Sequence, residues 1–331
     1  MHLPIPLKFP PMEARLAKEL PRSGPYQFEP KWDGFRAICF RDGDEVALQS
    51  KSRQPLARYF PEIVDAALTL STKKFVLDGE LVVPVDDRLD FEQLLQRIHP
   101  AASRVRKLAE EFPATYLVFD LLVDDKGNAV YELPLVRRRV LLEAFAAKYF
   151  KKTNERFRLS PATLDRKVVQ RWFDSAGSSM DGIIAKRLDM GYSSGDRNGM
   201  IKVKNLRTAD CVVGGYRSSG NSVGSLLLGL YDENGLLDYV GFTSGFGVEE
   251  KKSLFKQLSA MKAARSFTGR TPGGPSRWNR GKESEWVPVK PELVLEVQFD
   301  HVTNGRFRHG TRPLRFRPDK NPRQCTTEQI T

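Results

Sequence analysis

Short apolar segments alternate with amphipathic ones along the first two-thirds of the chain, and this alternation constrains the fold most. Five segments of strand-like composition occupy residues 26–40, 45–52, 75–83, 115–122 and 181–187. Between them, apolar residues recur at helical spacing in residues 91–98, 135–150 and 163–176. Such strands and helices bury their apolar faces by packing against each other. Residues 1–205 are therefore predicted to form a mixed α/β domain.

The pattern changes after residue 204. Three short strand-like segments separated by Gly-rich turns cover residues 211–217, 224–232 and 237–245, and a helix is predicted over residues 249–264. This arrangement is typical of a small Greek-key barrel that carries one helix. Residues 267–285 are rich in Gly, Pro, Arg and Ser and are predicted to be a loop. A second domain is therefore expected over residues 206–331.

The charge of the chain favours a polyanionic partner. Its 331 residues include 53 Lys and Arg against 41 Asp and Glu, a formal charge of +12. From Leu206 onward there are 19 basic and 13 acidic residues, so the excess is not confined to one tail. A basic surface that extends over two folded domains suits nucleic acid.

The cysteines and the hydropathy exclude several other classes of protein. Cys39, Cys211 and Cys325 are far apart and form no pair with zinc-ligand spacing, which favours a reduced compartment. The N-terminus lacks the apolar core of a signal peptide, and no window approaches the roughly 20 apolar residues of a membrane span. A cytoplasmic protein without a membrane partner is expected.

Five stretches place acids or lysines beside strand-like apolar runs. They are "KWDGFR" from Lys31, "FVLDGELVV" around Glu80, "YLVFD" around Phe119, "MDGIIAKR" around Asp181 and "MIKVK" with Lys202 and Lys204. Taken singly, each has an ordinary interpretation. Asp-Gly between apolar residues predicts a hairpin, and exposed strand charges and buried aromatic residues are common. Their joint order along the chain is more informative than any one of them.

In this order and at these separations, the five stretches resemble the nucleotidyltransferase motifs of ATP-dependent DNA ligases. The resemblance spans residues 29–320 and continues into "WVPVKPELVLEVQFD" and "FRHGTRPLRFRPDK" near the C-terminus. The compact C type of bacterial ligase is the most similar subgroup. The resemblance implies an α+β fold. An ATP-grasp-like nucleotidyltransferase (adenylation) domain of antiparallel sheets and helices is expected over residues 1–205, followed by a β-barrel OB-fold domain over residues 206–331.

The resemblance identifies Lys31 as the catalytic nucleophile, which attacks the α-phosphate of ATP, forms lysyl-AMP and releases pyrophosphate. An amine must be neutral to attack, whereas an unperturbed lysine has a pKa of about 10.4. Neighbouring cations and a metal-bound phosphate favour the neutral form. Lys202 and Lys204, two residues apart on one strand face, are expected to provide positive charge and to neutralise phosphate oxygens in the transition state.

Further positions match the family pattern around the nucleotide. The resemblance implies that Glu29 accepts a hydrogen bond from the adenine amino group and that Phe119 stacks on the purine. Arg36 and Glu80 are expected to hold the ribose. Mg²⁺, with Mn²⁺ as the alternative, is expected at carboxylates, because hard cations take oxygen ligands. The candidate metal ligands are Asp33, Glu80 and Asp181.

Basic residues from both domains are expected to bind phosphate. In the first domain, Arg53 occupies the place of a family arginine that grips phosphate near the nick, and Arg197 is a second candidate. In the last domain, the resemblance assigns the pyrophosphate leaving group to the motif "RFRPDK", with Arg315, Arg317 and Lys320.

Such a motif must close over the site for adenylation and leave it for DNA, so residues 205–208 are predicted to be a hinge.

Two positions depart from the family pattern. Asp181 stands where many ligases have Glu, which leaves its direct contact with metal open, because its side chain is shorter. Met200 stands where an aromatic residue often precedes the K-x-K strand.

The predicted function is ATP-dependent sealing of nicks in duplex DNA, with DNA repair as the setting. After formation of lysyl-AMP, AMP is transferred to the 5′-phosphate of the nick, and the 3′-hydroxyl then attacks and releases AMP. Nicked duplex DNA is the expected partner, contacted by both basic domains and by the loop over residues 267–285. DNA-repair polymerases are candidate protein partners, and a monomer is the expected state.

Other functions share parts of this pattern. An RNA ligase or a GTP-using capping guanylyltransferase has the same lysine chemistry, but Glu29 and the C-terminal motifs favour a DNA ligase. An NAD-dependent DNA ligase normally has a four-cysteine zinc module, which three cysteines cannot build. A non-catalytic nucleic-acid-binding relative is the alternative from another class, and the intact set of Lys31, Glu80, Lys202 and Lys204 speaks against it.

Overall fold

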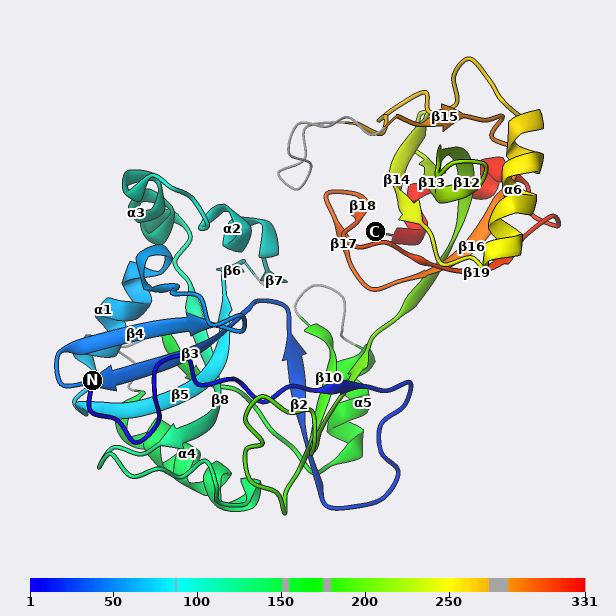
Figure 1. The fold of residues 1–331 in the computed structure, drawn as a ribbon. Coiled ribbons are helices and arrows are strands. Elements are labelled where there is room, and N and C mark those ends of the chain that lie inside the picture. The colour runs from blue at the N-terminus through cyan, green and yellow to red at the C-terminus, as the bar shows by residue number, and fades with distance from the viewer. Residues whose placement is uncertain (87, 151–154, 175–179, 274–284, 331) are drawn as a thin grey trace. The chain divides into compact units, whose positions relative to one another are not determined.

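The computed structural model describes residues 1–86, 88–150, 155–174, 180–273 and 285–330. It divides into two compact units, Met1–Asn205 and Leu206–Thr331, each with its own hydrophobic core. Figure 1 shows the elements of both units. None of the helices in the described part of the chain has the length and the apolar character that a membrane crossing requires.

A five-stranded sheet forms the centre of the first unit. Its order is β4-β3-β5-β8-β9, antiparallel except for the β8–β9 pair. The strands are β3 (Phe35–Asp42), β4 (Glu45–Ser50), β5 (Lys74–Val82), β8 (Thr115–Val123) and β9 (Phe157–Leu159). The middle strands β3, β5 and β8 are buried on both faces over most of their length, which explains their nearly continuous apolar sequences.

Helices cover this sheet. They are η1 (Ala57–Tyr59), α1 (Pro61–Thr69), α2 (Phe91–Gln96), α3 (Ala102–Glu111) and α4 (Leu135–Tyr149). In Figure 1, α4 lies below the sheet. Phe60 and Ile63 at the start of α1 pack in one core with Phe75 of β5 and Phe145 of α4. The helices thus bury one face of the sheet and leave its other side for the second sheet of the unit.

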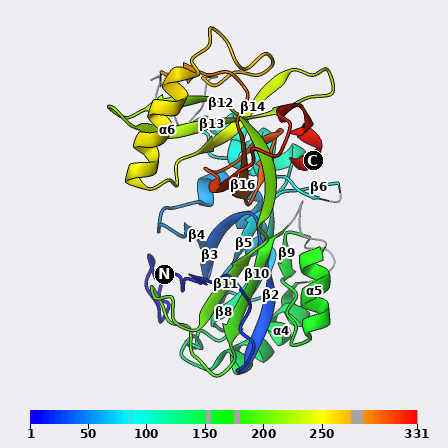
Figure 2. The same cartoon turned by 90° about the vertical axis from the view of Figure 1, so that its right-hand side faces the viewer.

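A four-stranded sheet with the order β1-β11-β10-β2 forms the second layer of the first unit. Its strands are β1 (Arg15–Leu16), β2 (Tyr26–Trp32), β10 (Met180–Arg187) and β11 (Met200–Lys204). Figure 2 shows β2, β10 and β11 side by side. Helix α5 (Arg166–Asp174) packs Val169 against Phe28, Ile183 and Ala185 of this sheet. A short ribbon of β6 (Pro84–Val85) and β7 (Arg88–Leu89) completes the unit.

The hairpin interpretation of Asp33–Gly34 is wrong. Strand β2 pairs with β10, whereas β3 pairs with β4 and β5, so this turn connects two sheets and not two partners of one ladder. Gly34 approaches β5 of the five-stranded sheet closely, since a Cβ on Gly34 would lie 2.3 Å from the carbonyl oxygen of Leu81. Local turn chemistry predicts the bend, but the partner of each strand is set by tertiary packing. The turn therefore places Asp33 at the junction of both sheets.

The second unit is built on a six-stranded antiparallel sheet. Its main path is β14-β13-β12-β16-β19, and β15 also pairs with β12. The strands are β12 (Arg207–Ser218), β13 (Val223–Tyr231), β14 (Leu237–Thr243), β15 (Val287–Pro288), β16 (Val294–Phe299) and β19 (Arg312–Phe316). The remaining elements are α6 (Val248–Ala260), β17 (Val302–Thr303), β18 (Arg306–Phe307), η2 (Pro322–Gln324) and η3 (Thr327–Ile330).

The predicted closed barrel is not present as a continuous ladder among the described residues. Strands β14 and β19 are the two edges of the sheet, and an isolated bridge between Thr243 and Thr311 connects them where β19 begins. Pro313, inside β19, has no backbone N–H to extend this pairing. Residues 274–284, most of the predicted DNA-binding loop over residues 267–285, lie outside the described residues.

Candidate active site

Side chains of opposite charge meet on one face of the four-stranded sheet. Because alternate residues of a strand share a face, Gln27, Glu29 and Lys31 of β2 point in the same direction. Across the sheet, Lys31 and Lys204 are both register partners of Gly182. Gly182 has no side chain, so nothing at its own position separates the two lysine side chains. The strand register therefore places the predicted nucleophile and Lys204 of the predicted phosphate-binding strand on the two sides of Gly182.

Lys31 forms an ion pair with Asp181. The register of β10 on β2 shifts at this point, because Met180 is opposite Trp32 and Gly182 is opposite Lys31. Asp181 is the additional residue of this β-bulge, and bulges redirect side chains next to functional sites. Gly182 has φ +142°, and a Cβ there would lie 2.1 Å from the carbonyl oxygen of Val203. The Asp-Gly pair thus provides both the carboxylate and the backbone conformation that aims it at Lys31.

Several cations surround Lys202. Burial lowers the pKa of Lys202, and the positive charges of Lys31, Lys51, Lys204 and Arg197 lower it further. Like charges close to one another repel unless an anion lies among them. The cations around Lys202 therefore form a ready site for phosphate oxygens.

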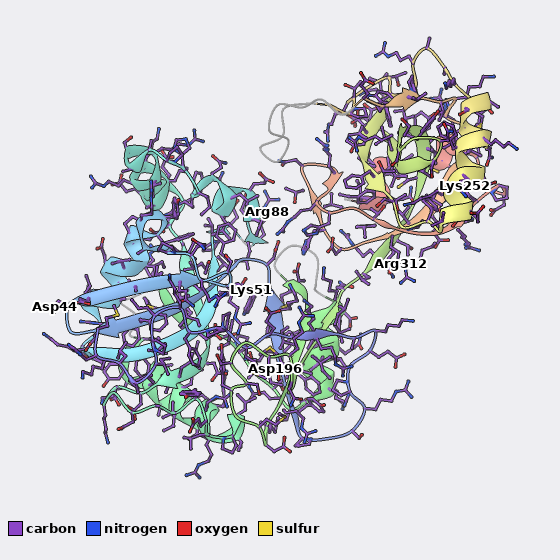
Figure 3. The ribbon with its side chains drawn as sticks, in the orientation of Figure 1. Asp44, Lys51, Arg88, Asp196, Lys252 and Arg312 are labelled. Carbon is purple, nitrogen blue, oxygen red and sulfur yellow. The ribbon has the colours of Figure 1, made fainter. Side chains whose placement is uncertain are left out.

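Glu13 contributes to the arrangement of these cations. Its carboxylate lies 3.4 Å from Lys51 and 3.3 Å from Arg197, although 70% of the Arg197 side chain is exposed. Lys51 is labelled in Figure 3. Arg53, which follows Lys51 by two residues, is exposed and has φ +64°. It lies on the turn after β4, where exposed charge is available to a large substrate.

Three carboxylates lie near Lys31. One oxygen of Asp33 and one of Asp181 are within 4.8 Å of each other. Burial raises the pKa of Glu80 to about 8, because the attraction of Lys31 and Arg36 does not offset desolvation and the nearby acids. Carboxylate oxygens are the ligands that hard divalent cations prefer, and a cation would relieve the repulsion among these acids. The donor set fits Mg²⁺ or Mn²⁺.

A buried ion pair lies nearer the start of β2. Glu29, which is 2% exposed, accepts a hydrogen bond from Gln27 at 2.8 Å and pairs with Lys186 at 2.7 Å. The Lys186 ammonium also lies 4.5 Å from the centroid of the Phe119 ring. Glu29 and Phe119, predicted from the sequence to bind the purine, are thus connected through one lysine head group.

The guanidinium of Arg36 is held in place by Asp78. Its Nε and Nη2 atoms donate to the two oxygens of Asp78 at 3.0 and 2.6 Å, and its guanidinium lies 5.2 Å from the Phe119 ring centroid. Tyr192 donates its hydroxyl hydrogen to Asp78 at 2.5 Å. Asp78 is fully buried, so it acts as a fixed anchor for Arg36. Arg36 is also opposite Glu80 in the β3–β5 register, which brings the two predicted ribose-binding residues together.

The C-terminal candidates Arg315, Arg317 and Lys320 lie in the second unit. Each is paired with carboxylates of that unit: Arg315 with Glu296 at 2.7 Å, Arg317 with Asp210 and Asp319, and Lys320 with Asp210 at 2.7 Å. Their predicted role in binding the leaving group therefore depends on how a phosphate competes or cooperates with these acids.

The sequence interpretation missed several residues that shape the site. Lys186 had a signal, since it ends the acid-Gly-x-x-x-Lys stretch. Asp78 had one too, because it precedes Glu80 by two residues and alternate strand residues share a face. Tyr192 had none, since it reaches Asp78 from 114 positions away. Gln27 and Lys51 become recognisable only once their charged partners are in place.

Comparison with known protein families assigns the chain. The model of the ATP dependent DNA ligase domain matches residues 11–204, more than half of the chain, and the model of the ATP dependent DNA ligase C terminal region matches residues 219–320. The chain belongs to the ATP-dependent DNA ligase family. The first match covers all the candidate site residues of the first unit, and the second covers Arg315, Arg317 and Lys320.

Individual relatives of this ligase agree with the assignment. It is 45% identical to DNA ligase C2 of Mycolicibacterium smegmatis over 100% of this chain and 96% of the relative. It is 30% identical to the multifunctional non-homologous end joining DNA repair protein LigD of Mycobacterium tuberculosis, over 93% of this chain and 38% of the relative. A solved structure of a Lig E DNA ligase has the same fold, with a TM-score of 0.57, 17% identity and coverage of 93% of this chain and 99% of that one.

Proposed function

We propose that this ligase seals nicks in duplex DNA through a lysyl-AMP intermediate formed on Lys31. The observation that supports this most is the position of Lys31, which is ion-paired with Asp181 and adjoins the cations around Lys202. In the first step, the Lys31 nitrogen forms a bond to the α-phosphorus of ATP and the bond to the pyrophosphate oxygen breaks. Asp181, the ion-pair partner of Lys31, would hold the proton that the amine must lose.

The remaining residues of the first unit have roles in binding and orientation. Glu29, held by Gln27 and Lys186, can accept a hydrogen bond from the adenine amino group, and Phe119 offers a face for the purine. Arg36 and Glu80 are expected at the ribose. Lys202 and Lys204 neutralise charge on the phosphate oxygens as pyrophosphate leaves, which is the main protein contribution to phosphoryl transfer.

A divalent cation, Mg²⁺ or Mn²⁺, would be held by Asp33, Asp181 and Glu80. When bound, it would polarise the phosphate and offset its negative charge. Burial raises the pKa of Glu80 to about 8. The positive charge of the cation would also favour the ionised form of this carboxyl group.

We infer that the second unit, residues 206–331, is an OB-like domain that supplies Arg315, Arg317 and Lys320 to the pyrophosphate. Residues 205–208, which follow β11 and include the first two residues of β12, are the proposed hinge. Limited proteolysis and small-angle scattering with and without ATP test this. A single unchanged shape and cleavage pattern would contradict it.

Nicked duplex DNA is the proposed substrate, with Arg53 and Arg197 at its phosphates and the ligase acting as a monomer. We propose repair of DNA strand breaks as the setting, because the chain resembles both a DNA ligase C2 and the ligase part of an end-joining repair protein. DNA-repair polymerases remain candidate partners for this reaction.

The deciding experiment detects the covalent intermediate. The protein, first freed of bound AMP with pyrophosphate, is incubated with Mg²⁺ and α-labelled ATP and analysed by denaturing electrophoresis, in parallel with GTP and NAD. We expect an adduct from ATP. It should be lost in Lys31→Ala and retained in Lys107→Ala, a control at an exposed side chain. No adduct from any nucleotide would refute the proposal. If the adduct forms, sealing of nicked DNA is compared with sealing of nicked RNA to identify the substrate.

A further inference from the structure

Three cations and three carboxylates form one cluster in the second unit. The cations are Arg315, Arg317 and Lys320, and the carboxylates are Asp210, Glu296 and Asp319. At neutral pH their formal charges cancel. The cations proposed to meet the leaving group are therefore already occupied by acids of their own unit, and the position of each acid decides what the cations can do.

Strand register puts two of these acids side by side. Asp210 of β12 is directly opposite Glu296 of β16, and Glu296 is opposite Arg315 of β19. Like charges directly opposite on neighbouring strands are destabilising. Cations must offset this cost, and the nearest ones are those of the C-terminal motif. The sheet thus places the adjacent carboxylates of Asp210 and Glu296 where they attract Arg317 and Lys320.

Asp210 is the point at which the two cations meet. Nη1 of Arg317 donates to its oxygens at 3.2 and 3.3 Å, and the ammonium of Lys320 donates to Oδ2 at 2.7 Å. The Nε and Nη2 atoms of Arg317 are directed instead to Asp319, at 2.8 to 3.2 Å. One edge of the guanidinium is therefore fixed by Asp210, and the other edge by Asp319.

The two acids differ in rigidity. Asp210 is 8% exposed and lies within β12, and its backbone N–H and carbonyl both bond to the side chain of Gln329 at 2.9 and 3.2 Å. In contrast, 64% of the Asp319 side chain is exposed. A buried carboxylate with a pinned backbone cannot follow its partners when they move. Asp210 therefore sets where Arg317 and Lys320 lie.

We propose that Asp210 is a positioning residue for polyphosphate binding, which holds Arg317 and Lys320 side by side so that both can meet the pyrophosphate part of ATP. This rests on the proposed role of the C-terminal cations in forming lysyl-AMP. Asp210 acts through these cations and does not touch the phosphate. Its contribution belongs to adenylation alone, because sealing of a nick that already carries AMP involves no pyrophosphate.

The test separates these two steps in Asp210→Asn. Single-turnover formation of lysyl-AMP is followed across ATP concentrations, and sealing of a pre-adenylated nick is followed without ATP. Since misplacement of a charged group can cost a large factor in rate, we expect kcat/KM for adenylation to fall by roughly tenfold or more. Sealing of the pre-adenylated nick should change by less than about threefold, because that step does not use the leaving-group site.

A matched control removes an acid from an ordinary surface pair of the same unit. Glu249 pairs with Lys252 at 2.8 Å on α6, where Figure 3 labels Lys252, and both side chains are mostly exposed. Glu249→Gln changes the net charge by the same amount as Asp210→Asn. It should leave both steps unchanged, since exposed pairs contribute little. A loss of adenylation in the control as large as in Asp210→Asn would refute a specific role of Asp210.

A double-mutant cycle protects the test against misfolding. Asp210→Asn removes the counterion of Lys320 and one of the counterions of Arg317, which keeps Asp319. Asp210→Asn with Lys320→Gln restores the charge balance of the cluster. If Asp210 acts through Lys320, the double variant should lose no more adenylation than the worse single variant. Additive losses, undiminished adenylation in Asp210→Asn, or equal losses in both steps in the double variant would each overturn the proposal. Absence of a lysyl-AMP adduct in the unmodified ligase would instead refute the proposed function.

Discussion

Replacing Asp120 with asparagine should destabilise the first unit strongly. Asp120 and Arg138 are each 2% exposed, and they share two hydrogen bonds, from Nε at 2.8 Å and from Nη2 at 3.0 Å. Nη1 of Arg138 also donates to the carbonyl oxygens of Leu133 and Met190 at 2.6 and 3.2 Å. The arginine cannot leave for solvent without breaking these contacts. The substitution therefore leaves a buried cation without its counterion.

The expected cost follows from burial. Removing one partner of a buried ion pair typically costs about 3–5 kcal/mol. Asparagine keeps one oxygen that can accept a hydrogen bond, so the lower end, roughly 3 kcal/mol, is expected for Asp120→Asn. For a domain of this size, each kcal/mol lowers Tm by about 2–4 °C, so a decrease of roughly 6–12 °C is expected.

The dependence on pH provides an independent check. Burial alone would raise the pKa of Asp120, but the charge and hydrogen bonds of Arg138 outweigh it, and the pKa is lowered. The ionised carboxylate therefore contributes stability above the unfolded pKa of about 4, and this contribution is lost as the pH falls through the lower folded value. The difference in Tm between the unmodified ligase and Asp120→Asn should be constant near neutral pH and shrink below about pH 4.

Thermal unfolding followed by circular dichroism between pH 3 and pH 8 measures both effects. Asp44→Asn is the control, because Asp44, labelled in Figure 3, forms an exposed pair with Lys73 at 3.6 Å. Its Tm should change by less than about 2 °C. Asp120→Leu with Arg138→Met removes both charges and should recover most of the loss. A decrease of less than 2 °C in Asp120→Asn would refute the reasoning.

Three further predictions concern the site itself. Lys186→Met leaves buried Glu29 without its 2.7 Å partner, so kcat/KM for lysyl-AMP formation should fall by roughly tenfold or more, as measured by ATP titration; an unchanged value would contradict the role of this pair. Tyr192→Phe removes a buried hydrogen bond next to Arg36, and KM for ATP should rise a few-fold with kcat largely retained; equal effects on both would indicate a merely structural role. Burial raises the pKa of Glu80 to about 8, so the ionised form is disfavoured in the folded protein and stability falls as the pH rises from 4.5 to 8. Without metal, Glu80→Gln should lack this fall, and its Tm advantage should grow over that interval; parallel melting curves would contradict the raised pKa.

Most strands of the first unit could be predicted from the sequence because their apolar runs are long and buried. The segments around Val76, Val118 and Ile183 fold as β5, β8 and β10. Helices α1 and α3 were missed. In α1, Pro61 provides an N-terminal signal, but only Ile63, Ala66 and Ala67 are buried, so its apolar stripe is short. Short stripes are difficult to separate from loop sequence.

Strand pairing could not be predicted in the same way. The turn at Asp33–Gly34 has the chemistry of a hairpin, yet its two strands join different sheets. The competing interaction is the pairing of β2 with β10, which brings Asp181 to Lys31 from 150 residues away. Contacts of such separation leave no local signal. Only the resemblance to a known family placed these residues in one site before the structure did.

Charge pairing is the other feature that composition cannot reveal. The formal charge of +12 predicts a polyanionic partner, but it does not tell which cations are available to one. Lys31 is paired with Asp181, and Lys320 with Asp210. A phosphate must therefore displace an internal carboxylate or bind the donors that remain, and the rigidity of that carboxylate decides which occurs. The bulged Asp181 and the buried Asp210 are both fixed by the backbone, so the cations in this ligase are oriented before the nucleotide arrives. Preorganised charge of this kind costs little reorganisation when the phosphate binds.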